Sequence, residues 1–314
     1  MLKLSVIIVS YNTKELLKNC LNSLKQATKN ISHEIIVVDN GSIDDTISMI
    51  NSFFPEIILI ANKENKGFAS ACNQGLLMMN GEYALFLNSD LLLFEDTIDK
   101  LINFMDNNAE AAIAGAQLLN PDGSKQNSID LFPSLLTELF NKSLLKFLMK
   151  KKYPSKRSGI DHPIVVESLV GACMIVRKNV LDNIGFFDED YFFYMEETDL
   201  CYRIKKANLK VYFVPDAFVV HFQGKSVKKT PKKGKVEYYR SRYIFFRKNR
   251  GFYPYILLKL GLIIKLSFEI LLQGAGVFLT LGLNSKVRRR FFITIYLFLW
   301  HIFLCPEGWG LNGK

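Results

Sequence analysis

Three acidic side chains lie within four residues of one another, at Glu196, Glu197 and Asp199, where an apolar pattern predicts the start of a helix. The helix dipole favours carboxylates in a first turn, and this effect alone accounts for one or two of them. Three of them directly after the aromatic run at residues 191–194 indicate a site. A carboxylate within hydrogen-bond reach of a substrate hydroxyl can remove its proton, so general-base chemistry is predicted here.

Polar, turn-forming residues occur at three points where an apolar run ends: residues 10–12, 39–42 and 88–90. Asn, Asp, Gly and Ser are common turn formers, and this explains any one of the three clusters. Three clusters at one sheet edge, two of them with a carboxylate, favour a binding site. Asp39 is available to accept a hydrogen bond from a ring N–H such as that of a pyrimidine base, and Asp90 to coordinate a divalent cation.

The elements that must position these side chains follow from the apolar periodicity. Short runs, apolar on both sides, predict buried parallel strands at residues 4–9, 35–38, 56–60 and 83–87. Helical patterns separate them, and the first is predicted to begin with a capping box of Asn12 and Glu15. Strand and helix in alternation predict an open α/β sheet of right-handed βαβ units, whose ligands bind at the carboxyl ends of the strands.

Composition sets the broad class. The 314 residues are 49% hydrophobic and 22% charged, which excludes disordered, collagen-like and disulfide-stapled proteins. The net charge of +10 is uneven: residues 225–314 hold 18 basic and three acidic residues, or +15, which leaves −5 for residues 1–224. Such a basic tail suggests an anionic partner, either a membrane surface or a nucleic acid. The five cysteines lack metal-site spacing and predict reduced thiols in a cytosolic compartment, and the N-terminus predicts no export signal.

Seven segments, in order, carry a family resemblance over residues 4–226. They read VIIVSYN, VVDNGSIDDT, NKGFASACNQG, LFLNSD, GACMIVRK, FDEDYFFYMEETDLCYR and HFQGKS. The chain resembles the family 2 glycosyltransferases of the GT-A fold, near the rhamnosyltransferase-like members that act on lipid-linked glycans. The resemblance implies a catalytic domain at residues 1–224, with a mostly parallel open sheet flanked by helices. Residues 225–314 would form a basic loop and membrane-associating helices.

The resemblance assigns the strand-end residues to a nucleotide-sugar donor. Asp39 is placed as the residue that binds the base, and Asn65, Gly67 and Asn73 lie in the segment that runs along the nucleotide and diphosphate. An ordinary helix N-terminus is the alternative explanation for Gly67. The predicted donor site comprises Ser10, Tyr11, Asn12, Asp39, Asn40, Gly41, Ser42, Asn65, Gly67, Asn73, Asn88, Ser89 and Asp90.

The resemblance also implies a metal site for Mg²⁺ or Mn²⁺. The family's DxD motif reads Asn88-Ser89-Asp90, so one carboxylate is replaced by an amide, which should weaken the metal site. Asp90 is then the main anionic ligand. His221, from the HxxG segment, is a further candidate ligand, although a lone His after an apolar strand is ordinarily structural.

The implied reaction is an inverting single displacement without a covalent enzyme intermediate, so Cys173 is read as a packed small residue. Glu197 corresponds to the second acid of the family's ED pair and is the predicted base. Glu196 is the fallback, and Asp199 completes the predicted catalytic set. The resemblance favours dTDP-rhamnose as donor, with UDP-sugars close behind, and a lipid-linked glycan as acceptor.

The tail can be read in two ways. Six lysines between Lys225 and Lys235, followed by aromatics interleaved with arginines, are compatible with nucleic-acid binding. The apolar stretch at residues 252–283 argues against it, because its polar residues fall on one stripe: Lys259, Lys265, Glu269 and Gln273. We expect a monotopic anchor or a re-entrant hairpin on the cytoplasmic face of the membrane, and no nucleic-acid partner. Ordinary core helices are the remaining alternative, and residues 135–149 predict one more basic, apolar helix.

Two other functions compete with sugar transfer. Asn88 and the basic tail are compatible with a non-catalytic membrane or nucleic-acid binding protein on a degenerate transferase fold. The retained Asp39, Asp90, Glu197 and His221 argue against it. A nucleotidyltransferase would need a glycine-rich phosphate loop after the first strand, and the sequence SYNTKE is not such a loop.

Overall fold

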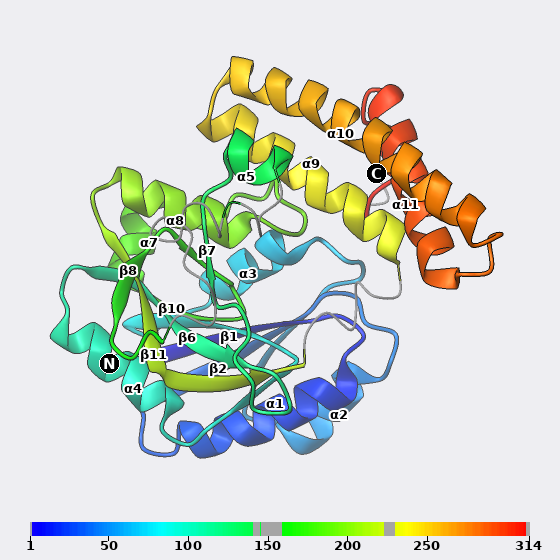
Figure 1. Cartoon of the computed structure of the whole chain (residues 1–314). Coiled ribbons are helices and arrows are strands. Elements are labelled where there is room, and N and C mark those ends of the chain that lie inside the picture. The colour runs from blue at the N-terminus through cyan, green and yellow to red at the C-terminus, as the bar shows by residue number, and fades with distance from the viewer. Residues whose placement is uncertain (1, 141–144, 146–158, 223–229, 312–314) are drawn as a thin grey trace. The chain divides into compact units, whose positions relative to one another are not determined.

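A nine-stranded sheet forms the framework of the first part of the chain in the computed structural model, which describes residues 2–140, 145, 159–222 and 230–311 (Figure 1). The strand order is β3-β2-β1-β4-β10-β6-β11-β5, and β8 pairs with β11. Strands β10, β5 and β8 run opposite to the other six, so the sheet is mixed but mostly parallel, as predicted. The strands are β1 Leu4–Ser10, β2 His33–Asp39, β3 Ile58–Ala61, β4 Tyr83–Asn88, β5 Leu91–Leu93, β6 Ala111–Leu119, β8 Ile164–Val166, β10 Cys173–Arg177 and β11 Lys210–His221; β7 Ile129–Asp130 and β9 Ser168–Leu169 form a separate ribbon.

The register of the parallel strands brings the predicted polar clusters to one edge. Ser10, the last residue of β1, lies beside Asp39, the last residue of β2. On the other side of β1, Val9 pairs with Asn88, the last residue of β4. The three carboxyl ends are therefore neighbours, because β1, β2 and β4 are adjacent, parallel and in step.

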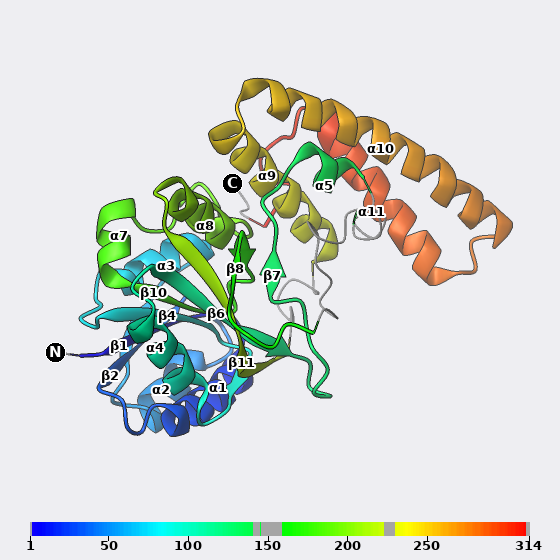
Figure 2. The same cartoon turned by 60° about the vertical axis from the view of Figure 1, so that its left-hand side comes forward.

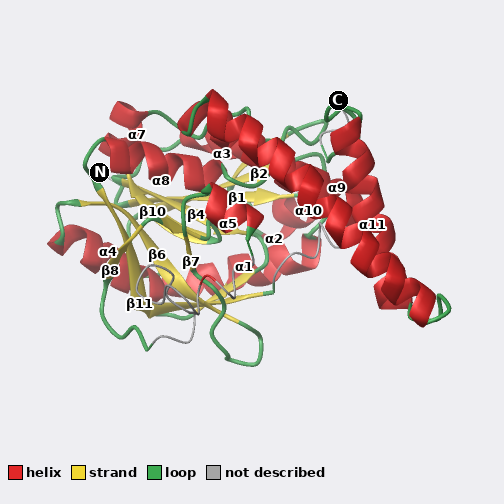
Figure 3. Ribbon diagram, turned by 45° about the horizontal axis from the view of Figure 1, so that its top comes forward, coloured by secondary structure: helices red, strands yellow, loops and turns green. Residues whose placement is uncertain are grey.

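Helices cover both faces of this sheet (Figure 3). Val6 and Ile8 of β1 point into the core cluster that contains residues of α1, α2 and α4, whereas Ile7 points to the other face. There Gly75 of α3 packs so closely that a Cβ would come within 2.6 Å of the Ile7 Cγ2. The helices of this part are α1 Lys14–Ala27, α2 Thr46–Phe53, α3 Phe68–Leu76, α4 Thr97–Asn107, α7 Lys178–Ile184 and α8 Glu196–Lys206.

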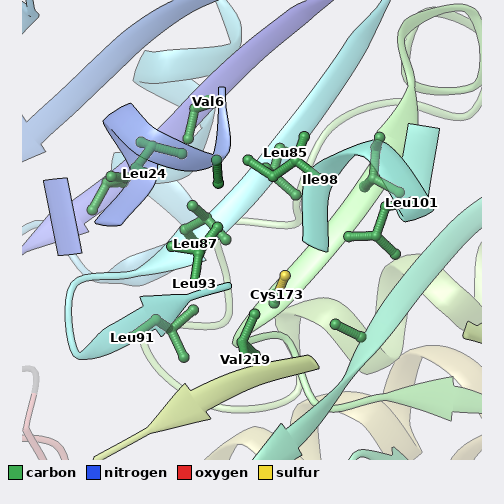
Figure 4. Close-up of a cluster of buried hydrophobic side chains, with 14 of the residues drawn as sticks. Val6, Leu24, Leu85, Leu87, Leu91, Leu93, Ile98, Leu101, Cys173 and Val219 are labelled. Atoms are coloured by element: carbon green, nitrogen blue, oxygen red, sulfur yellow. The ribbon is translucent and has the colours of Figure 1, made fainter. Parts of the chain in front are cut away.

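The main core lies between the sheet and helices α1, α2 and α4 (Figure 4). Leu85 and Leu87 of β4 contribute to it together with Ile98 and Leu101 of α4. Cys173 at the start of β10 belongs to the same cluster, which confirms that it is a packed residue. Burial raises the pKa of its thiol to about 12, so the thiol is held neutral and unreactive.

The chain divides into two compact units, each of them built from several segments. The sheet unit contains Met1–Phe132, Pro154–Tyr191 and Glu196–Ser226. The helical unit contains Pro133–Tyr153, Phe192–Met195 and Val227–Lys314. The predicted boundary at residues 224 and 225 falls outside the described residues and remains a prediction.

Four described helices make up the helical unit (Figure 2). A buried ion pair ties two of them together, because the Arg242 Nε donates to the Glu138 Oε2 at 2.5 Å. The Tyr238 ring lies on the guanidinium of Arg242, with 3.4 Å between the guanidinium carbon and the ring centroid. The helices are α5 Leu135–Leu139, α9 Pro231–Asn249, α10 Phe252–Leu279 and α11 Ser285–Ile302.

The structure describes the early strands in full and the helix predicted at residues 135–149 in part. The four early strands are confirmed within a few residues. The predicted helix at residues 135–149 is described over α5, which ends at Leu139 with Phe140 as its C-cap. Residues 141–144 and 146–149 lie outside the described residues, as do Lys225, Lys228 and Lys229. Among the described helices, none combines the length and the apolar composition needed to cross a membrane.

Candidate functional site

A chain of hydroxyl groups links the ends of β1 and β4. The Ser10 Oγ lies 3.1 Å from the Thr13 Oγ1, which in turn lies 2.9 Å from the Ser89 Oγ. These contacts join the first and third predicted clusters, 76 residues apart in sequence. Hydrogen bonds between hydroxyl groups therefore hold the loop after β1 against the Asn88-Ser89-Asp90 segment.

The loop after β1 is joined in the same way to the loop after β2. Asn12 has a positive φ of 53°, its N–H donates to the Ser42 Oγ, and its Oδ1 accepts from the Ile43 N–H. The predicted capping box was wrong, because helix α1 begins at Lys14 and the Asn12 side chain is used by the neighbouring loop. The Tyr11 side chain is exposed at this edge.

Asp39 ends β2 with a completely buried carboxylate. Its Oδ2 accepts from the Ser42 N–H at 3.0 Å, but its Oδ1 has no hydrogen-bond partner among the described residues. An unsatisfied buried acceptor costs about 1–3 kcal/mol, so native proteins keep few of them. The Asp39 Oδ1 is therefore a strong candidate for a ligand contact.

Asn40 holds the loops around this carboxylate together. Its Nδ2 donates to the Asn65 Oδ1 and to the Gly67 carbonyl, and its Oδ1 accepts from the Asn62 side chain and the Lys66 N–H. The Asn40 side-chain amide therefore donates two and accepts two hydrogen bonds within the protein. Asn40 and Asn65 shape the predicted donor site through this network.

Two glycines let the backbones in this region approach closely. Gly41 has a φ of 83°, and a Cβ at this position would lie 2.9 Å from the backbone of Glu64. Gly67 has a φ of 90° and precedes α3 without a side-chain cap. Any larger residue at Gly41 would push apart the loops that follow β2 and β3.

Asn73 on α3 contacts the loop at Phe187 and Glu189, which is more than 100 residues away in the chain. Its Nδ2 donates to the Phe187 carbonyl and the Glu189 Oε1, both at 2.9 Å, and its Oδ1 accepts from the Phe187 N–H. These contacts fix the segment that leads toward Tyr191. The structure therefore gives Asn73 a loop-anchoring position.

Asp90 and His221 converge from β4 and β11. The Asp90 Oδ1 lies 3.3 Å from the His221 Nε2, and both side chains are largely buried. The other ring nitrogen, Nδ1, lies 3.2 Å from the Gln126 Oε1. The described residues contain no cluster of three or more His, Cys, Asp or Glu side chains that could hold a metal ion.

The orientation of Gln126 determines how His221 presents its ring. The Gln126 Nε2 donates to two carbonyls, those of His221 and Leu119, so its Oε1 must face the His221 Nδ1. The Nδ1 then donates its proton, and in a neutral ring the Nε2 carries a lone pair directed toward Asp90. A carboxylate and an imidazole lone pair facing one another form a suitable donor set for a divalent cation.

Glu197 occupies a half-buried position at the start of α8. It packs on Gly171, where a Cβ would come within 3.1 Å of the Glu197 Cβ, so a larger residue would displace it. Ala172, the next residue, accepts from the Asn88 N–H, which places Glu197 near the end of β4. The Glu197 Oε2 is buried and has no hydrogen-bond partner among the described residues.

The surroundings of Glu197 shift the pKa of its carboxyl upward. Burial raises the pKa of its carboxyl, and the negative charge of Asp130 on β7 raises it further, while hydrogen bonds from the backbone of Gly171 and Thr198 oppose the shift. A raised pKa is typical of a carboxyl group that exchanges protons with a substrate.

The other two acids of the cluster are placed differently. Glu196 is buried at the start of α8. The Asp199 Oδ2 accepts from the Arg203 Nε at 2.8 Å, and its Oδ1 accepts from the Tyr191 hydroxyl. Arg203 also donates to three carbonyls at residues 184–186, so this pair anchors the loop before α8.

Three residues of this region were missed from the sequence: Thr13, Gln126 and Asp130. Thr13 stands next to a predicted cluster, and its hydroxyl was a signal that could have been used. Gln126 contacts His221 across 95 residues, and no local pattern indicates that contact. Asp130 lies on a two-residue strand whose pairing with β9 gives no sequence periodicity.

The polar residues at the ends of β1, β2 and β4, the hydrogen-bonded loops that follow them and the mixed sheet are the arrangement expected of a glycosyltransferase with the GT-A fold. The family described as "Glycosyl transferase family 2" matches residues 5–185 of the chain. This protein belongs to glycosyl transferase family 2, and within it the chain is rhamnosyltransferase-like. The match ends before Glu197 and His221.

Two relatives whose names describe rhamnosyl transfer support the same assignment. The chain is 28% identical to the N-acetylglucosaminyl-diphospho-decaprenol L-rhamnosyltransferase of Mycobacterium tuberculosis, over 77% of this chain and 83% of that protein. It is 29% identical to the dTDP-rhamnosyl transferase RfbF of Shigella flexneri, over 80% of this chain and 81% of that protein.

A solved structure supports the fold. The mannosyltransferase PcManGT from Pyrobaculum calidifontis, in complex with GDP-Man and Mn²⁺, superposes with a TM-score of 0.59 at 16% identity. The superposition covers 97% of this chain and 87% of that one.

Proposed function

We propose that this protein is an inverting, divalent-metal-dependent glycosyltransferase that moves a sugar from a nucleoside-diphosphate sugar to a hydroxyl of a lipid-linked or cell-surface glycan. The observation that carries the proposal is the Asp39 Oδ1, a buried acceptor without a partner among the described residues, at the shared carboxyl ends of β1, β2 and β4. Ligands of open α/β sheets bind at such ends.

The donor proposal rests on the chemistry of Asp39. A carboxylate oxygen accepts from the ring N–H that thymine and uracil share, so dTDP- and UDP-sugars both fit. The names of the relatives favour rhamnose and dTDP as the first donor to test. The decaprenol-linked name of the mycobacterial relative supports a lipid-linked acceptor.

Asp90 and His221 are the residues that we propose to hold Mg²⁺ or Mn²⁺. Their oxygen and nitrogen face one another at 3.3 Å, and a site with few protein ligands fits an ion that is also bound by substrate phosphates. The Mn²⁺ in the mannosyltransferase structure supports this choice. When bound, such an ion neutralises charge that develops on the leaving diphosphate.

Glu197 is the proposed general base. Its carboxylate would accept the proton of the acceptor hydroxyl as the oxygen attacks the anomeric carbon, and the bond to the diphosphate breaks in the same displacement. Asp199 is engaged by Arg203 and Tyr191, so we assign it to positioning the start of α8. Glu196 is kept as the alternative base.

Calorimetric titration tests the donor site directly. We expect dTDP or UDP to bind detergent-purified protein in the presence of Mn²⁺, and to bind more weakly with EDTA, and GDP, whose guanine also carries a ring N–H, is titrated for comparison. Failure of both pyrimidine diphosphates under both conditions would contradict the proposed donor site. Equal binding with Mn²⁺ and EDTA would contradict only the metal dependence.

Replacement of Gln126 tests the metal proposal through His221. In Gln126→Leu the His221 Nδ1 loses its acceptor, so the ring is no longer held with the Nε2 lone pair toward Asp90. We expect Mn²⁺ affinity, measured by electron paramagnetic resonance with dTDP present, to fall by about 10- to 100-fold. Asn127→Ala, at the exposed neighbour, is the control and should bind Mn²⁺ normally. Unchanged affinity in a folded Gln126→Leu protein would show that Gln126 does not position the ligand.

A further inference from the structure

The polar stripe of α10 faces the interior of the helical unit. The Lys265 Nζ donates to the Glu138 carbonyl at 2.9 Å, and the Gln273 Oε1 accepts from the Thr294 hydroxyl at 3.0 Å. The Lys259 Nζ lies 5.4 Å from the ring centroid of Tyr243 on α9. These polar groups are satisfied by α5, α9 and α11, so they do not define the outer face of α10.

The outer face of α10 is apolar instead. Exposed residues recur at steps of three and four, which places them on one side of the helix. Over Leu257 to Leu271 this side extends about 20 Å along the helix axis. The most exposed of its central residues are Ile264 at 71%, Phe268 at 62% and Leu271 at 71%. A continuous apolar surface of this length is typical of a site that contacts a partner or a lipid.

Exposed apolar residues also follow the end of α10. Leu281 and Leu283 between α10 and α11 are more than 80% exposed. Leu299 and Ile302 on α11 are also exposed. The other exposed apolar residues between positions 252 and 304 are Phe252, Tyr253, Leu257, Leu260, Leu272, Phe278, Leu279, Phe292, Phe303 and Leu304.

Positive charge adjoins the apolar surface. Lys286, Arg288, Arg289 and Arg290 are all exposed and directly follow Leu281 and Leu283 in the chain. Residues 230–311 hold 14 basic and three acidic residues, and one of the acids, Glu237, is buried. This balance disfavours a second copy of the same surface as the occupant, because two such basic surfaces would repel one another.

The geometry points to an anionic lipid bilayer as the occupant, with the outer face of α10 lying in the plane of the membrane and Lys286 and Arg288–290 at the headgroups. The opposite face of α10 is covered by the other helices of the unit, so only this side is available to lipid. Anionic lipids attract basic residues of this kind on the cytoplasmic leaflet, and an apolar helix face enters the region between headgroups and acyl chains. The inference does not depend on the proposed sugar transfer.

Vesicle flotation of the full chain tests the inference. We expect the protein to float with vesicles of phosphatidylcholine and phosphatidylglycerol, and much less with phosphatidylcholine alone.

The triple variant Ile264→Gln, Phe268→Gln, Leu271→Gln keeps the charge and should lower vesicle affinity by at least about tenfold. The variant Arg288→Gln, Arg289→Gln, Arg290→Gln should lose the preference for phosphatidylglycerol. Phe53→Gln with Leu77→Gln, at exposed apolar positions of the sheet unit, is the matched control and should float normally.

Two outcomes would overturn the inference. Normal flotation of the Ile264, Phe268, Leu271 variant would show that this face does not contact lipid. The second outcome is a change of oligomeric state with unchanged flotation. If light scattering shows a dimer for the unchanged chain and a monomer for that variant, the face joins two copies of the protein. Circular dichroism of each variant checks that the helices are retained. Titration of dTDP and UDP in detergent reports on the donor site separately, so a failure of the sugar-transfer proposal is distinguishable.

Discussion

Glu197→Gln is expected to lower the rate of sugar transfer by between about a hundredfold and ten-thousandfold while leaving nucleotide affinity unchanged. The amide has nearly the same size and keeps the packing against Gly171, but it cannot accept a proton from the acceptor hydroxyl. The measurement pairs a transfer assay with calorimetric titration of the nucleotide. Glu196→Gln is the matched variant on the same helical turn. If Glu196→Gln abolishes transfer and Glu197→Gln does not, Glu196 is the base.

The pH dependence of the unchanged enzyme provides a second test of Glu197. Burial and then the charge of Asp130 raise the pKa of Glu197, so a larger fraction of the protein holds the inactive, protonated base at mildly acidic pH. The acidic limb of kcat/KM should therefore lie above the usual range for a glutamate. Asp130→Asn removes a negative charge, lowers this pKa and should move the limb to lower pH. An acidic limb at the same pH in Asp130→Asn would show that the charge of Asp130 does not affect the pKa of Glu197.

Asp39→Asn is expected to weaken dTDP and UDP binding by about 10- to 100-fold. The asparagine oxygen can still accept from the Ser42 N–H, but its amide group then points an N–H donor at the position where the base presents its own N–H. Calorimetric titration of both nucleotides measures the loss.

Asp45→Asn is the control for this variant. Asp45 is exposed, lies on the loop that follows the same strand and has a positive φ, a conformation that asparagine tolerates. It should bind nucleotide normally. Equal affinities for the unchanged protein and Asp39→Asn would rule out the proposed base contact.

The strand-end part of the site could be predicted because local patterns determine it. Apolar β-branched runs define β1, β2 and β4, and parallel neighbours in step bring Ser10, Asp39 and Asn88 to one edge. Contacts that depend on distant segments were not predictable in this way. The Gln126 contact with His221 depends on how β11 returns beside β6, which a single sequence does not reveal.

The orientation of α10 shows a different limit. Periodicity locates a polar stripe on Lys259, Lys265 and Gln273, but it does not say whether water or protein satisfies that stripe. The Glu138 carbonyl and the Thr294 hydroxyl satisfy part of it, so the polar side faces inward. The direction of a helix face is decided by its partners, and these lie on separate segments of the chain.

The composition of the helical unit from separate segments has a consequence for synthesis. Glu138 and Arg242 form a buried ion pair although they are 104 residues apart in the chain. At the rate at which ribosomes extend a chain, Arg242 follows Glu138 by on the order of ten seconds. During that interval the α5 segment has no arginine for its carboxylate, whereas β1, β2 and β4 are already made. The sheet can therefore assemble while the ribosome is still translating, and the helical unit can close only near the end of translation.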